Sequence, residues 1–124
     1  MFTRRVDFVM RMDVELEHAF EELGVRSVVG GVERAASEAL LEHGQEATSF
    51  TADLRGVWTS IGVAFKGDTA GASAAFDAWC DRIMRVRNSG RVRTASLTGS
   101  DGTHRAYIDA RVRQGLEASL PLRA

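Results

Sequence analysis

Residues 66–71 read KGDTAG and carry the strongest turn signal in the sequence. Glycine commonly follows the last residue of a helix, so Gly67 suits a helix C-terminus. Aspartate and threonine are favoured at helix N-caps, so Asp68 or Thr69 should begin the next element. This stretch therefore predicts the point at which the chain reverses between two long elements.

Apolar residues recur in steps of three and four on both sides of this turn, which is the spacing of one helical face. The pattern predicts one long helix over residues 25–66, a second over residues 72–115, and a short acidic helix over residues 13–23. The apolar residues expected in the core or in an interface are Phe50, Leu54, Trp58, Ile61, Phe65, Phe76, Trp79 and Ile83.

An antiparallel hairpin centred on the turn would place apolar residues opposite one another along its length. Trp58 would face Trp79, Ile61 would face Phe76, and Leu54 would face Ile83. Residues 98–103 contain glycines, and local signals alone predict a loop there. We nevertheless expect the second helix to continue through them, because the pairing extends beyond this segment.

The expected fold class is therefore all-α, with a long antiparallel helical hairpin in a single domain spanning residues 1–124. Residues 1–11 are interpreted as a flexible extension, because Met12 could be an alternative start, and residues 117–124 as a tail. Two such helices cannot bury all their apolar residues in each other. Pairing with a second hairpin into a four-helix bundle, as a homodimer or a heterodimer, would bury the remainder.

Composition and charge limit the classes of function that this chain is expected to have. The chain has 124 residues and a net charge of −1, which does not favour a general polycation for nucleic acid. It has no apolar run of the roughly 20 residues that a membrane span needs. Asp7 and Arg11 interrupt the apolar N-terminal stretch, so a secretory signal peptide is not expected. These features predict a cytoplasmic chain.

No constellation typical of catalysis stands out. Histidine and cysteine spacings for a helix-borne metal site are absent, and so is a phosphate-binding loop. We therefore expect no enzyme activity, no cofactor and no metal. The rival functional feature is a basic cluster, which could bind nucleic acid or pair with the acidic segment before it. This cluster consists of Arg82, Arg85, Arg87, Arg91 and Arg93.

The order of Trp58, the glycine-containing turn and Trp79 resembles the Trp-X-Gly helical hairpins of type VII (ESX) secretion. The resemblance covers about residues 25–115, and residues 93–109 are similar to the C-terminal part of related actinobacterial hairpins. The sequence departs from the family in that Thr59 and Ser60 follow Trp58. Where the family's export signal carries an acid four residues after a tyrosine, Tyr107 is followed by Arg111.

The resemblance implies a non-enzymatic interaction protein that serves as a type VII secretion substrate or partner. Its partner would be a second copy, another helical hairpin or a larger secreted effector, and export by that route would follow. The alternative is a helical nucleic-acid-associated module that uses the basic cluster.

Overall fold

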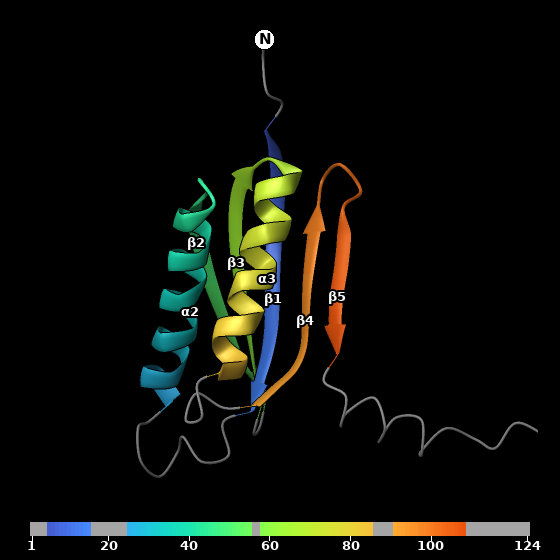
Figure 1. Cartoon of the computed structure of the whole chain (residues 1–124). Helices are drawn as coiled ribbons and strands as arrows, with labels where there is room; N and C mark the ends of the chain where they lie inside the picture. The colour runs from blue at the N-terminus through green and yellow to red at the C-terminus, as the bar shows by residue number, and fades with distance from the viewer. Residues whose placement is uncertain (1–4, 16–24, 56–57, 86–90, 109–124) are drawn as a thin grey trace, which may run out of the picture.

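The computed structural model describes residues 5–15, 25–55, 58–85 and 91–108, which form an antiparallel sheet with two helices on one face (Figure 1). The prediction of an all-α hairpin is therefore wrong. In chain order the elements are β1 (Val6–Glu15), α2 (Val25–Glu42), β2 (Glu46–Arg55), β3 (Trp58–Gly67), α3 (Thr69–Arg85), β4 (Arg91–Gly99) and β5 (His104–Ile108).

The sheet has five strands in the order β2-β3-β1-β4-β5. The first six elements follow the split β-α-β plan, in which each helix crosses over one intervening strand. The fifth strand then pairs with β4 as a hairpin. Since both helices lie on the same side, the sheet has a covered face and an open face (Figure 1).

Strand β1 lies at the centre of the sheet and pairs with both β3 and β4. Burial alternates along this strand, with Phe8, Met10, Met12 and Val14 buried beneath the helices. The residues between them face the open side. Residues 6–11 are thus part of the central strand rather than an extension. The short helix expected over residues 13–23 is contradicted at residues 13–15, and its remainder lies outside the described residues.

The long helix expected over residues 25–66 ends at Glu42. The rest of that segment forms the β2–β3 hairpin, in which Phe50 pairs with Val63 and Ala52 with Ile61. The proposed pairing of Trp58 with Trp79 does not occur, because Trp79 is fully buried while Trp58 is half-exposed on the open face.

The second expected helix, over residues 72–115, ends at Arg85 as α3. The chain then forms β4 and β5, and Ser100 to Gly102 lie in the turn between them, as the local signals in residues 98–103 indicated. With a sheet in place of the helical hairpin, the four-helix bundle is also wrong. Within the described residues, neither helix is long and apolar enough to cross a membrane.

The turn in residues 66–71 is only partly as predicted. Asp68 does cap α3, since its Oδ1 accepts a hydrogen bond of 2.6 Å from the amide of Gly71. Gly67, however, ends strand β3 rather than a helix. The two helices are linked in the core, where the Trp79 indole of α3 donates a 3.0 Å hydrogen bond to the carbonyl of Val32 of α2, and Ala36 and Ala75 are fully buried.

Candidate functional site

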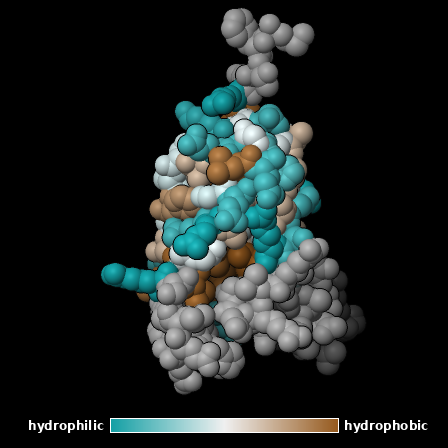
Figure 2. Space-filling model, turned by 60° about the vertical axis from the view of Figure 1, so that its left-hand side comes forward, coloured by the Kyte–Doolittle hydropathy of each residue, from teal (hydrophilic) through white to brown (hydrophobic). Residues whose placement is uncertain are grey.

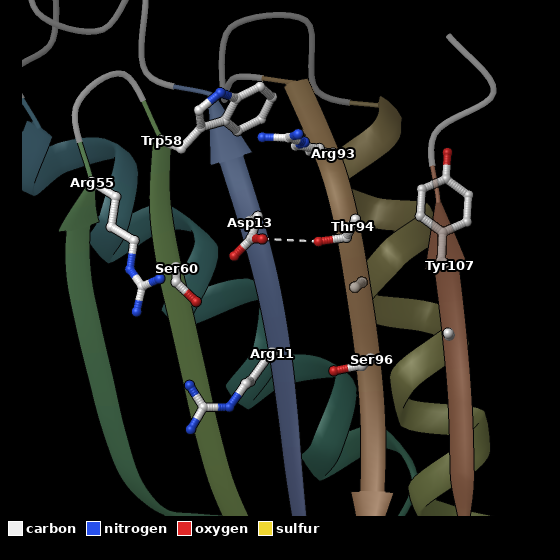
Figure 3. Close-up of a pocket in the computed structure, with 11 residues that line it drawn as sticks. Arg11, Asp13, Arg55, Trp58, Ser60, Arg93, Thr94, Ser96 and Tyr107 are labelled. Carbon is white, nitrogen blue, oxygen red and sulfur yellow. Dashed lines mark hydrogen bonds between the residues drawn. The ribbon is translucent and has the colours of Figure 1, made fainter. Parts of the chain in front are cut away.

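The open face of the sheet holds a cavity of about 580 Å³. It lies at the end of the sheet where β3 and β4 begin and where β1 and β2 end (Figure 3). Every strand contributes to its wall, because the residues that alternate with the buried ones all point to this side. The open-face side chains that line it belong to Arg11, Asp13, Arg55, Trp58, Ser60, Arg93, Thr94, Ser96 and Ala106. Ala95 and Tyr107 also border the cavity, although their positions in the register place their side chains on the covered face.

Three arginines from three different strands reach this cavity. The guanidinium of Arg93, on β4, lies over the ring of Trp58 at 5.3 Å from its centroid. Arg55, at the end of β2, forms a 3.0 Å ion pair with Asp53 and is largely exposed. Arg11, on β1, is exposed and makes no ion pair within the described part of the chain. The site therefore offers at least one uncommitted guanidinium.

Gly62 lies on the open face between Arg11 of β1 and Thr51 of β2. A Cβ on Gly62 would lie 2.6 Å from Oγ1 of Thr51, which is too close, and 3.9 Å from Nη1 of Arg11, which is ordinary contact. The arginine side chain can thus extend over β3 across a position without a side chain, as Figure 3 shows by its direction toward β3 and β2. The absence of a side chain at Gly62 thus shapes the floor of the cavity.

Asp13 is the only carboxylate among the residues that line the cavity. It accepts a hydrogen bond of 2.9 Å from the hydroxyl of Thr94 on the neighbouring strand (Figure 3). Because Arg55 is paired with Asp53, the guanidinium groups of Arg11 and Arg93 face the one carboxylate of Asp13, and the lining keeps an excess of positive charge, which favours an anion. The hydroxyls of Ser60 and Ser96 add donors and acceptors that carry no charge.

The structure separates the arginine cluster expected from the sequence. Arg82 lies on the helical side and forms ion pairs with Glu38, at 2.9 Å, and with Glu42. Arg93 lies on the open face of the sheet. Arg87 and the side chains of Arg85 and Arg91 lie outside the described residues. The interpretation that the cluster pairs with the acidic segment thus applies to Arg82.

The structure also places the residues that were expected in the core or in an interface in different environments. Ile61, Phe65, Phe76, Trp79 and Ile83 are buried between the sheet and the helices. Phe50 and Leu54 are exposed on β2, and Trp58 lines the cavity. The sequence reasoning missed Arg11, Asp13 and Arg55 as site residues. The alternation of apolar and polar residues in Val6–Glu15, which only Val9 interrupts, was the signal that could have placed the first two on an open face.

The described residues contain no group of three or more histidine, cysteine or acidic side chains that could hold a metal ion. Burial, followed by the charge of Asp77, raises the pKa of the Cys80 thiol to about 12. The thiol is therefore protonated at neutral pH and is not suited to act as a nucleophile.

No family model matches this chain, and no curated protein matches it. The type VII secretion resemblance therefore stays a prediction from sequence, and the helical hairpin with which it was associated is replaced by the sheet.

Proposed function

We propose that this protein is a non-enzymatic binding protein whose open sheet face takes a small, planar anion. The observation that carries the proposal is the convergence of Arg11 and the Arg93–Trp58 pair on one cavity. Pockets for small molecules commonly have volumes of roughly 300–1,000 Å³, and the cavity of about 580 Å³ falls within that range.

The chemistry of the lining specifies the ligand class. A guanidinium group presents a planar fork of donors that matches a carboxylate or a phosphate. Trp58 supplies a flat apolar surface at the same end of the cavity. Because Arg93 already lies against that ring, a planar ligand could extend the stack while its anionic group reaches Arg11. Ser60 and Ser96 would hydrogen-bond to polar atoms of the ligand.

The test is a calorimetric titration with matched charged and neutral probes. The pairs are 2-naphthoate with 2-naphthamide, and adenosine monophosphate with adenosine. At least one anion should bind more tightly than its neutral counterpart. Arg11→Gln and Arg93→Gln should each weaken that binding by roughly 10-fold or more, as expected for a lost charged hydrogen bond.

Arg34→Gln is the matched control, because Arg34 is exposed on α2, which covers the opposite face of the sheet. It should leave the affinity unchanged. Equal affinity for the charged and neutral probes, or equal loss in all three variants, would contradict the proposal.

A second candidate function is binding of single-stranded nucleic acid to the same face. Sheets that bind single strands stack bases on aromatic side chains and track the backbone with cations, and Trp58 beside Arg93 offers one such position. Fluorescence anisotropy with an oligonucleotide of mixed sequence distinguishes the two. Nucleic-acid binding should weaken steeply with salt and need more than one nucleotide.

The partner predictions remain proposals. Association with a second copy or another chain, a cytoplasmic location, and export through type VII secretion were expected from the sequence and have no further support in the comparisons. The helical nucleic-acid module is not carried forward, because Arg82 and Arg93 lie on opposite sides of the sheet.

A further inference from the structure

Over the part of the chain that the structure describes, the two edges of the sheet differ in length. Strand β5 forms one edge and has five residues, His104–Ile108. Strand β2 forms the other edge and has ten residues, Glu46–Arg55. A long edge strand presents a row of backbone donors and acceptors that can pair with another chain. Natural edges are usually shortened, covered or interrupted, and β2 is interrupted only near its start, by a bulge between Ala47 and Ser49.

Strand β2 also carries apolar side chains that the helices do not cover. Phe50 and Leu54 pair with Val63 and Thr59 of β3, whose side chains are buried beneath the helices. They therefore point to the covered face of the sheet. Even so, Phe50 is 39% exposed and Leu54 is 59% exposed. Figure 2, in which the side of α2 and β2 comes forward, shows brown hydrophobic surface among the teal.

The sequence of β2 is self-complementary in one antiparallel register. Opposed residues in a sheet must point to the same face, which limits a two-fold pairing of β2 with itself to a few registers. With Ala52 opposite Ala52 of the partner subunit, Phe50 lies opposite Leu54 of the partner subunit, and the reverse pair repeats the contact. The three apolar residues of each copy then form one continuous strip.

The neighbouring registers are worse. Placing Phe50 opposite itself puts Leu54 opposite Glu46 of the partner subunit. Placing Asp53 opposite itself opposes two like charges, which is destabilising. Placing Thr51 opposite itself puts Leu54 opposite Thr48 of the partner subunit, at the bulge. The Ala52 register avoids all three problems.

We propose that this protein forms a two-fold dimer by antiparallel pairing of β2 with β2 of a second copy. The two sheets join into one continuous sheet, and Phe50 and Leu54 of both copies are covered by each other. Within the described residues, β2 is the only edge strand of this length, and a two-fold pairing uses it in both copies, so the assembly closes at two subunits. This interface is separate from the ligand proposal, because the side chains that form the strip point away from the open face.

The test begins with light scattering after size-exclusion chromatography at micromolar concentration. The chain should elute with the mass of a dimer. Phe50→Lys combined with Leu54→Lys should give a monomer, while the far-ultraviolet circular dichroism spectrum shows that the fold is retained. Leu41→Lys is the matched control, because Leu41 is 65% exposed on α2 and lies outside the strand. It should leave the dimer intact.

Cross-linking tests the register without relying on the lysine variants. Directly opposed residues have Cα atoms roughly 4.5–5.5 Å apart, which is within the range that a disulfide bridges. Ala52→Cys should therefore oxidise to a covalent dimer, whereas Asp53→Cys, which lies opposite Thr51 of the partner subunit, should do so much less. A wild-type chain that is a monomer at all concentrations, or a dimer that Ala52→Cys does not cross-link, would overturn the proposal.

Discussion

Replacing Gly67 by alanine tests the role of the neighbouring Gln45 side chain. The amide of Gln45 links the chain just after α2 to Asp68, the residue that caps α3. A Cβ atom at Gly67 would lie 1.3 Å from Oε1 and 2.5 Å from Cδ of Gln45. Gln45 is only 5% exposed, and its Nε2 donates hydrogen bonds of 3.3 Å to the carbonyl of His43 and to Asp68. The amide therefore cannot remain in place beside an alanine, and it has little room to move.

The expected cost follows from the contacts that must be given up. Displacing the amide breaks two hydrogen bonds, each contributing about 0.5–1.5 kcal/mol. Overpacking a buried position commonly adds about 1–3 kcal/mol. Gly67 is not among the glycines with positive φ, so alanine is not strained there and gains about 0.5–1 kcal/mol in the strand. We expect Gly67→Ala to lower the free energy of unfolding by about 2–4 kcal/mol, measured by urea titration.

The decisive comparison is the same change in a Gln45→Ala background. Gln45→Ala alone removes two hydrogen bonds but also removes a buried Oε1 that has no donor within the described residues, so its net effect should stay within about 1 kcal/mol. With the amide gone, Gly67→Ala should become stabilising by about 0.5–1 kcal/mol. Gly30→Ala is the control, since nothing lies within 4 Å of its Cβ position on α2. The reasoning is refuted if Gly67→Ala costs the same in both backgrounds.

Three further predictions concern single side chains. Because burial raises the pKa of Cys80 from 9.0 to about 12, a thiol reagent at pH 8 should label the folded protein roughly 1,000-fold more slowly than the protein in urea. Hydrogen bonds from Thr103 lower the pKa of Asp101, so this carboxylate stabilises the fold above its unfolded pKa and loses that effect as the pH falls through the folded value. Asp101→Asn should therefore flatten the loss of stability below about pH 4 in a urea titration series. Arg82→Ala removes ion pairs with Glu38 and Glu42 that are half-exposed, so it should cost only about 0.5–1 kcal/mol, and less in 1 M salt.

Some of the fold could be predicted from local signals. Residues 25–42 were correctly assigned to a helix, because Val32, Ala36 and Ala39 follow helical spacing and are buried. Asp68 was recognised as a possible N-cap, and the loop signal in residues 98–103 marked the β4–β5 turn. These features depend only on residues that are close in the sequence, so they can be predicted without knowledge of the strand pairing.

The main error has a geometric cause. A step of four residues keeps a side chain on nearly the same face of a helix, but because four is even it also keeps the side chain on the same face of a strand. Phe50 and Leu54, or Ile61 and Phe65, therefore fit both structures. The residues between them decide the matter. Between Ile61 and Phe65 the chain alternates as Gly62, Val63 and Ala64, which has the period of a strand.

The candidate site could not be assembled from the sequence for a different reason. Arg11, Trp58 and Arg93 are far apart along the chain, and only the strand order brings them to one end of the open face. A prediction that assigned β1 and β4 to an extension and a helix had no means of placing them together. The composition of the site was readable only after the pairing of the strands was known.

The sequence pattern and the structure lead to opposite interpretations of residues 1–11, and these predict different behaviour for a chain that starts at Met12. As an extension, these residues could be removed without loss. In the structure, however, Phe8 and Met10 are fully buried, and the segment pairs with both β3 and β4. Truncating one large core side chain costs about 2–5 kcal/mol, so losing both side chains approaches the total stability of about 5–15 kcal/mol for a typical domain. The broken ladders on both sides of β1 add to this loss. We therefore expect the shortened chain to be unfolded by circular dichroism and amide NMR dispersion, and a native spectrum from it would show that β1 is not needed at the centre of the sheet.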